Sequence, residues 1–150
     1  MKLGIPAIAF SGRTGKQTAW NAPVETYMGV YADLSTTVTQ ALTNSGKPYL
    51  PSDIWLNVNF PKVTKAECSS VSDFKFVLSR IHVAVPLVTP DDVNTCENDG
   101  RLPTERSVVD TDGCYASISV GLADNKLDAG AKQQGIVLKK LKSILSCMPS

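Results

Sequence analysis

Four segments of the chain have the hydrophobic pattern of a strand, either as a short continuous apolar run or as an alternation of apolar and polar residues. The run at 5–10 (IPAIAF) is continuously apolar, as expected for a buried strand. The segment at 54–60 (IWLNVNF) alternates apolar and polar residues and ends before a proline. Segments 74–85 (FKFVLSRIHVAV) and 115–120 (YASISV) are also rich in β-branched and apolar residues. We therefore predict four strands at these positions.

Two further segments have the three- and four-residue spacing of amphipathic helices. The first predicted helix covers 24–44, and its apolar face consists of Tyr27, Tyr31, Leu34, Val38, Ala41 and Leu42. The second covers 128–147, and its apolar stripe consists of Val137, Leu138, Leu141, Ile144 and Leu145. The stretch at 89–106 is rich in Pro, Asp, Asn and Gly and is predicted to be a loop. This order of elements predicts an α/β sheet with at least one parallel crossover.

Length and composition are those of one soluble globular domain covering 1–150, with 43% hydrophobic and 19% charged residues. The formal net charge is +1 and no basic block is present, so electrostatics gives no argument for binding nucleic acid or a membrane surface. No apolar run approaches the roughly 20 residues that span a bilayer. The N-terminal stretch MKLGIPAIAFSG has no signal-peptide pattern.

The four cysteines are even in number, widely spread and free of CxxC pairs, and the chain has one histidine. A zinc site therefore has little support. Two disulfides in an oxidising, extracellular compartment are the favoured interpretation, with buried free thiols as the alternative.

The predicted layout also indicates which cysteines pair. A strand from Cys114 to residue 120 rises roughly 20 Å, and the following helix runs back on the order of 27 Å. Its last turn then returns to the level where the strand began, which places Cys147 near Cys114. Cys68 and Cys96 pair by elimination. Sequence alone permits three pairings.

The stretch at 4–18 (GIPAIAFSGRTGKQT) has the outline of a strand that leads into a phosphate-binding loop. The nucleotide-triphosphate loop G-x-x-x-x-G-K-[ST] is excluded, because Phe10 occupies its first glycine position and Gln17 replaces the hydroxyl residue that binds magnesium. A plain polar turn after the strand is the favoured interpretation, and a weaker anion site formed by the backbone amides around Ser11, Gly12 and Arg13 is the alternative. The candidate substrate-binding residues are Ser11, Gly12, Arg13 and Lys16.

No other segment supplies a catalytic centre. His82 lies within an apolar run, so we interpret it as a surface or hydrogen-bonded residue, and the G-x-S-x-G turn that would favour a serine triad is missing. The acidic loop at 91–100 lacks the residue order of a calcium loop and is interpreted as a solvated turn, with weak cation binding as the alternative.

Several stretches taken together resemble the SurE family of metal-dependent acid phosphatases, which act on nucleoside monophosphates as 5′/3′-nucleotidases. Three of them are central: GIPAIAFS (4–11), LNVNFP (56–61) and DGCYASISV (112–120). Three more are most similar to the secreted fungal branch of the family: FKFVLSRI (74–81), RLPTE (101–105) and LSCMP (145–149). The resemblance covers nearly the whole chain.

The resemblance implies a Rossmann-like α/β fold, of which this chain is expected to contain the C-terminal part as a partial sheet with flanking helices. Members of the family hold a divalent metal such as Mg²⁺ or Mn²⁺ with an Asp-Asp pair, a serine and an asparagine. These ligands precede the strand that GIPAIAFS matches, so no metal ligand, cofactor or catalytic residue transfers to this chain. Only Ser11 and Gly12 at the strand exit, and Asn57 and Asn59 in the next strand, occupy transferable positions.

These observations give three expectations for function. The first is a phosphatase-derived protein with little or no activity of its own. The second is a secreted fungal effector or elicitor recognised by a protein of a host plant, and the third is a weak phosphate- or nucleotide-binding module. A sheet that lacks the preceding strands would also have an open edge beside 5–10, which favours a homo-oligomer formed through that edge or a rearranged chain that covers it.

Overall fold

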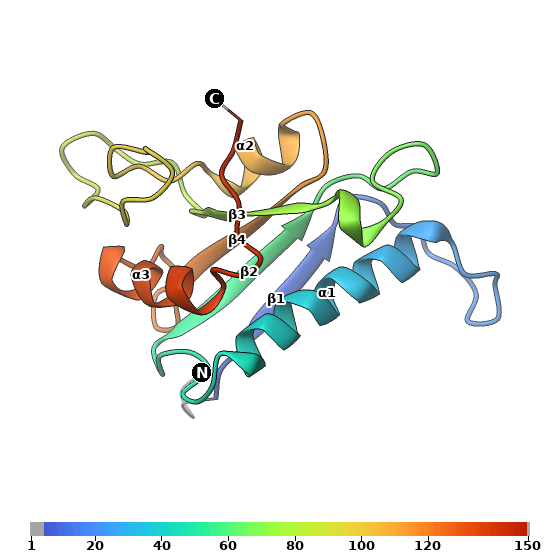
Figure 1. The fold of residues 1–150 in the computed structure, drawn as a ribbon, viewed down its shortest axis with the longest axis horizontal. Coiled ribbons are helices and arrows are strands. Elements are labelled where there is room, and N and C mark those ends of the chain that lie inside the picture. The colour runs from blue at the N-terminus through green and yellow to red at the C-terminus, as the bar shows by residue number, and fades with distance from the viewer. Residues whose placement is uncertain (1–4, 150) are drawn as a thin grey trace.

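A computed structural model describes residues 5–149; residues 1–4, at the start of the N-terminal stretch discussed above, and residue 150 lie outside the described part. The described residues form a mixed α/β fold around one four-stranded sheet (Figure 1). The elements in chain order are β1 (Ile8–Gly12), α1 (Thr26–Asn44), β2 (Ile54–Phe60), the short 3₁₀ helix η1 (Val71–Asp73), β3 (Lys75–Ser79), α2 (Glu105–Asp110), β4 (Tyr115–Leu122) and α3 (Ala131–Lys140).

The strand order across the sheet is β1-β2-β4-β3. β1 and β2 are parallel and are joined through α1, which confirms the predicted parallel crossover. β4 runs antiparallel to β2, and β3 is parallel to β4. The carboxyl ends of β1 and β2 therefore meet the amino ends of β3 and β4 at the same end of the sheet.

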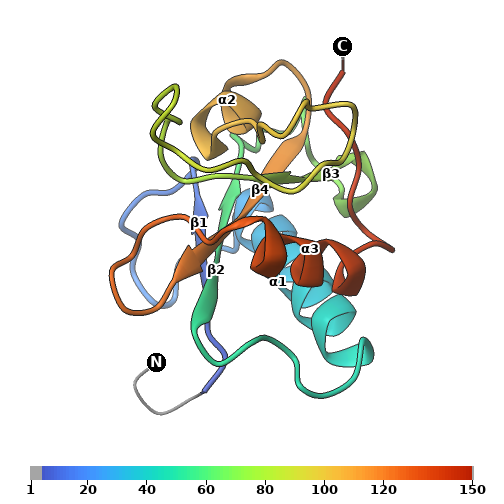
Figure 2. The ribbon, with the colours of Figure 1, turned by 90° about the vertical axis from the view of Figure 1, so that its left-hand side faces the viewer.

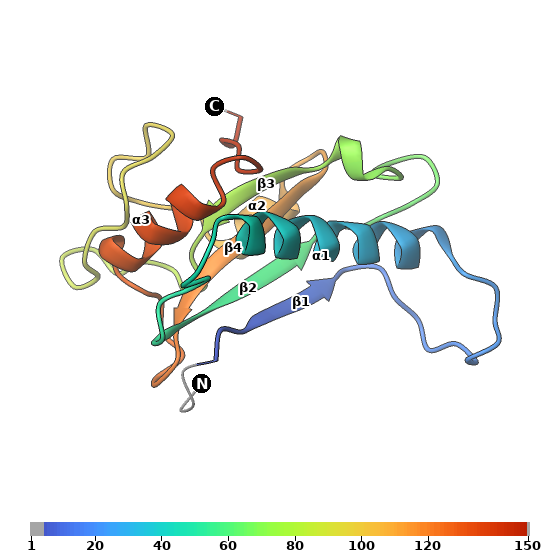
Figure 3. The same cartoon turned by 60° about the horizontal axis from the view of Figure 1, so that its bottom comes forward.

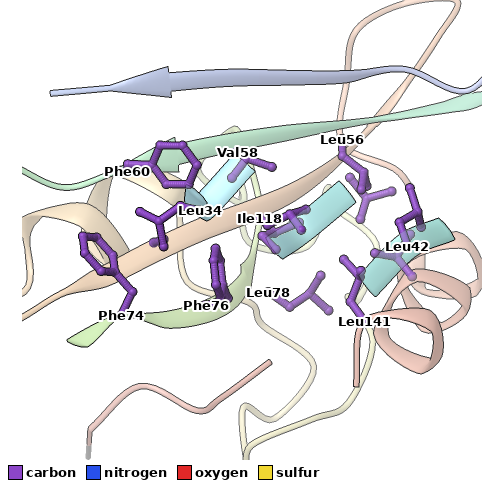
Figure 4. Close-up of a cluster of buried hydrophobic side chains, with 14 of the residues drawn as sticks. Leu34, Leu42, Leu56, Val58, Phe60, Phe74, Phe76, Leu78, Ile118 and Leu141 are labelled. Carbon is purple, nitrogen blue, oxygen red and sulfur yellow. The ribbon is translucent and has the colours of Figure 1, made fainter. Parts of the chain in front are cut away.

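The hydrophobic core lies between the sheet and the two longer helices (Figure 4). Alternation along β2 buries Leu56 and Val58 on the core side, and Ile118 of β4 lies beside them. α1 buries residues at four-residue intervals, including Leu34 and Val38, as its predicted apolar face requires. In Figure 3, α1 lies in front of the sheet and α2 behind it, so the second face of the sheet is covered by α2.

β1 differs from the predicted strand at 5–10 in its bounds and in its burial. It covers Ile8–Gly12, and of these residues Ile8 alone is partly buried. The physical reason is its position at the sheet edge, where it pairs with β2 alone among the described strands. A continuous apolar run was therefore wrong as evidence of burial here. The homo-oligomer through this edge stays a prediction.

β3 is shorter than the predicted strand at 74–85, because the chain leaves the sheet at Arg80. The Arg80 N–H donates to the Pro103 carbonyl over 2.9 Å, and the Glu105 N–H donates to the Arg80 carbonyl over 2.8 Å. The chain thereby pairs with the segment before α2 instead of continuing along β4. The predicted loop at 89–106 ends at this point, because α2 begins at Glu105.

α3 is likewise shorter than the predicted helix at 128–147. Asp128 lies before it and accepts hydrogen bonds from the backbone N–H groups of Ile81 and His82. After α3, the segment at 145–146 leaves the helical path, and the Ser146 N–H donates to the Phe76 carbonyl over 2.8 Å. The C-terminal segment thus runs along the outer edge of β3 (Figures 1 and 2).

The two disulfides join Cys68 to Cys114 and Cys96 to Cys147, so the predicted pairs Cys114–Cys147 and Cys68–Cys96 are wrong. Cys114 lies at the start of β4, and Cys68 lies in the segment leading to β3, the parallel neighbour of β4. The short α3 does not carry Cys147 back to that level. Instead, the C-terminal segment along β3 brings it to Cys96.

The presence of two disulfides is typical of secreted or extracellular proteins. None of the helices in the described part is both long and apolar enough to cross a membrane.

Candidate functional site

The sheet face opposite the core carries two rows of polar side chains that cross several strands. Strand register places Ser11 of β1, Asn59 of β2 and Ser117 of β4 side by side in the first row. The second row consists of Asn57 of β2, Ser119 of β4 and Ser79 of β3. In β2, β3 and β4 these residues alternate with buried apolar residues, so the alternation that predicted β2 also creates this polar face.

The second row is held together by α2. The Glu105 carboxylate accepts hydrogen bonds from Asn57 Nδ2 at 2.8 Å and from Ser119 Oγ at 3.3 Å. Ser119 Oγ and Ser79 Oγ lie 2.8 Å apart. Thr104 caps α2, because its side-chain oxygen accepts from the Ser107 N–H. α2 therefore holds the Glu105 carboxylate against the polar face of the sheet.

The first row has unused hydrogen-bonding capacity. Ser11 Oγ donates to Asn59 Oδ1. Asn59 Nδ2 and Ser117 Oγ are both buried and have no hydrogen-bond partner among the described residues. An unpaired buried polar group costs about 1–3 kcal/mol, so a bound acceptor, such as an oxygen of a ligand or of water, would stabilise these positions.

A pocket of about 220 Å³ opens beside the first row, between the ends of β1 and β2 and residues Glu105, Arg106 and Val109 of α2. The polar residues that line it are Ser11, Arg13, Asn59, Glu105 and Arg106. Gly12 also lines the pocket, and it packs so closely on Tyr31 that a side-chain carbon there would lie 2.3 Å from the ring. A glycine is therefore required where β1 enters the pocket.

Two arginines at the pocket mouth contact the same carboxylate. Arg13 forms an ion pair with Asp110 Oδ1, and its Nη1 also donates to the Val109 carbonyl at 3.2 Å. Arg106 Nε lies 3.4 Å from Asp110 Oδ2. The hydrogen bond from Arg13, assisted by Arg106, holds the pKa of Asp110 below its usual range. The pocket mouth therefore already holds one anionic group at neutral pH.

Lys16 lies outside this pocket, although the sequence grouped it with Ser11, Gly12 and Arg13. It lines a separate pocket of about 250 Å³ and forms an ion pair with Glu25 at 3.0 Å. The hydrogen bond to Glu25 raises the pKa of Lys16. The structure thus brings together three of the four candidate residues and separates the fourth.

Sequence reasoning did not find Glu105 and Arg106, which belong to the segment interpreted as loop. The alternation in β2 could have indicated that another element supplies polar partners. Asn57 and Asn59 lie on one face of a central strand, where their side chains require hydrogen-bond partners. The residues Pro103 and Thr104 before an acidic residue also form a helix-start pattern.

The other candidate chemistry falls elsewhere. His82 lies beyond β3, and its Nδ1 is 3.1 Å from Asp128 Oδ2. Within the acidic loop at 91–100, Asp92 is buried in an ion pair with Arg80 and is not a solvated turn residue. Over residues 5–149, no three His, Cys, Asp or Glu side chains gather in an arrangement able to hold a metal ion.

No protein-family model, characterised protein or solved structure matches this chain.

Proposed function

We propose that this chain is a SurE-like, phosphatase-derived protein with a partial Rossmann-like sheet, and that the pocket beside Ser11 binds phosphate or a phosphate monoester weakly. The observation that carries the proposal is the pair Arg13 and Arg106, which face one anionic group and line the same pocket as Asn59, whose amide nitrogen has no partner among the described residues. Guanidinium groups are suited to phosphate because they offer several donors in a planar arrangement. The carboxyl ends of parallel strands are also where open α/β sheets commonly bind ligands.

We expect binding without hydrolysis. Hydrolysis of a phosphate monoester needs charge neutralisation together with an activated nucleophile. The arginines provide positive charge, but Ser11 Oγ donates to the Asn59 amide oxygen, which is not a base. The family resemblance also assigns the metal ligands to residues that this chain does not match. A nucleoside monophosphate incubated with this chain and Mg²⁺ or Mn²⁺ is expected to release no phosphate above the protein-free rate.

Robust metal-dependent turnover by this chain would overturn the non-catalytic part of the proposal. A matched reaction with Arg13→Ala identifies the source of any release, because activity from a contaminating phosphatase would be unaffected by the substitution.

The Arg13→Ala variant is expected to bind inorganic phosphate about tenfold more weakly, because it loses a charge-assisted hydrogen-bond donor at the pocket mouth. Lys16→Ala is the matched control, since it removes the same charge from the neighbouring pocket and is expected to leave the affinity within about twofold. Titration followed by amide chemical shifts measures both affinities. Equal losses in the two variants would show a general charge effect and contradict the assignment to this pocket.

A second candidate function is a secreted effector or elicitor recognised by a protein of a host plant. Its support is the exposed apolar segment after β3, where Val83, Leu87 and Val88 extend into solvent. Large exposed apolar side chains in one segment are typical of interaction sites. The two candidates differ in the phosphate titration, because a recognition role alone requires no affinity at Arg13.

A further inference from the structure

Asp110 bridges two arginines that come from different parts of the chain. Arg13 follows β1, whereas Arg106 lies one turn before Asp110 on α2. The two carboxylate oxygens are divided between them, Oδ1 with Arg13 and Oδ2 with Arg106. A single anionic group with two oxygens, each facing one guanidinium, is the arrangement by which arginines also hold a phosphate.

The rest of the same pocket shows donors that Asp110 does not satisfy. Asn59 lines the pocket, and its Nδ2 is buried without a partner among the described residues. Ser117 Oγ, which also has no partner there, is its neighbour in the first polar row and lies outside the pocket lining. A carboxylate fixed to α2 occupies the charged mouth and leaves these donors free. A tetrahedral oxyanion has more oxygens and more charge than a carboxylate, so it can face both guanidinium groups and still offer an acceptor on the side of Asn59.

We propose that Asp110 is a resident counter-anion, and that an external phosphate enters this pocket by replacing the Asp110 carboxylate on Arg13 and Arg106. The inference rests on the proposed function, and it assigns control of the phosphate affinity to Asp110. Phosphate and Asp110 compete for the same guanidinium groups, so the internal carboxylate sets the affinity of the site.

The exchange is physically accessible because the bridge is exposed to solvent. The side chains of Arg13 and Asp110 are both nearly half exposed, and that of Arg106 is 85% exposed. Ion pairs in such positions are held weakly, since water competes with them. Arg13 also keeps its hydrogen bond to the Val109 carbonyl at 3.2 Å, which orients the guanidinium while the anion is exchanged.

Glu105 is the other carboxylate at this pocket, and it does not compete in the same way. Its Oε2 accepts hydrogen bonds from Asn57 and Ser119 on the sheet, whereas the carboxylate that Arg13 and Arg106 share is that of Asp110. The charge of Glu105 lowers the affinity for any anion by a constant amount in every variant. A change in affinity on replacing Asp110 therefore reports the exchange itself.

The test is a titration of wild type, Asp110→Asn and Asp112→Asn with inorganic phosphate. Asp110→Asn removes the charge of the competing group and keeps its size, so the affinity is expected to rise about three- to tenfold. Asp112→Asn is the control. It removes the same charge two residues further along the chain, at a side chain that forms no ion pair among the described residues, and it is expected to change the affinity by less than about twofold. A titration that follows the Arg13 side-chain resonance gives a second readout at the exchanged group.

The outcomes separate the two proposals. A rise in Asp110→Asn alone, with phosphate shifting the Arg13 resonance, supports the exchange. If wild type binds phosphate through Arg13 and Asp110→Asn binds no more tightly, the exchange is wrong while the proposed function stands. If wild type and Asp110→Asn both fail to bind phosphate, the proposed function is wrong and the exchange is overturned with it.

Discussion

Replacing Asp92 by alanine is expected to lower the free energy of unfolding by about 3–5 kcal/mol. Arg80 Nη1 and Asp92 Oδ2 lie 2.8 Å apart, and both side chains are about 5% exposed or less. Asp92 also accepts hydrogen bonds from Gln134 Nε2 at 2.7 Å and from the Leu102 N–H at 3.1 Å. Removing the carboxylate takes the acceptor away from all three buried donors. Arg80 keeps Asp128, at 3.7 Å, as its remaining ion-pair partner. The large cost arises because a buried guanidinium loses its nearer carboxylate and two further buried donors lose their acceptor, rather than because the pair itself is strongly stabilising.

Urea denaturation followed by circular dichroism measures this change. Asp91→Ala is the matched control, because Asp91 is the neighbouring residue and its ion pair with Arg101 is exposed. We expect that control to lose at most about 1 kcal/mol. A double variant, Arg80→Met with Asp92→Leu, is expected to lose less than Asp92→Ala, since it removes the buried guanidinium together with its nearer carboxylate. Asp128 then keeps the hydrogen bonds from the Ile81 and His82 N–H groups. Equal losses in Asp92→Ala and Asp91→Ala would contradict the buried network.

The sequence predicted those elements in which the spacing of apolar residues matches the face that packs on the core. The strand predicted at 54–60 is β2 with the same bounds, because a central strand has one face on the core and its alternation is complete. The helix predicted at 24–44 is α1, with its start two residues later, because its apolar face packs along its whole length on the sheet. In both elements, local pattern and tertiary environment agree.

Elements whose ends depend on distant residues were not predictable. β3 ends where Arg80 meets Asp92 and the segment before α2, and no local pattern encodes these partners. α3 ends early because the segment at 145–146 pairs with Phe76. The apolar residues after both elements kept the local pattern, so the predicted strand and helix were too long.

The prediction of the candidate site was right for the residues at the end of β1 and wrong for Lys16. Ser11, Gly12 and Arg13 lie together because they are consecutive at the end of one strand. Lys16 is three residues further, and in a loop this distance is enough to take it to Glu25 and another pocket. Arg106 reaches the pocket from α2, so its contribution depends on the packing of that helix on the sheet.

The disulfide pairing has a decisive chemical consequence. Replacing both Cys68 and Cys114 by serine is expected to leave no free thiol, because Cys96 and Cys147 remain joined. Under the pairing predicted from sequence, the same variant would have lost one cysteine from each disulfide, and two thiols would react. Thiol titration of the denatured, unreduced variant, with the wild-type protein as control, distinguishes these pairings without a structure determination.

Loss of either disulfide is expected to cost about 4 kcal/mol in the loop-entropy model, because the linked residues are 46 and 51 positions apart. Loop length alone thus predicts nearly equal losses for the two serine double variants, and a difference between them reports contacts of the folded state. Cys147 ends the segment that covers the outer edge of β3, where the Ser146 N–H meets the Phe76 carbonyl. Hydrogen exchange at Ser146 should therefore become faster when Cys96 and Cys147 are replaced, and stay slow when Cys68 and Cys114 are replaced. Equal acceleration in both variants would mean that the C-terminal segment is held by the sheet and not by its disulfide.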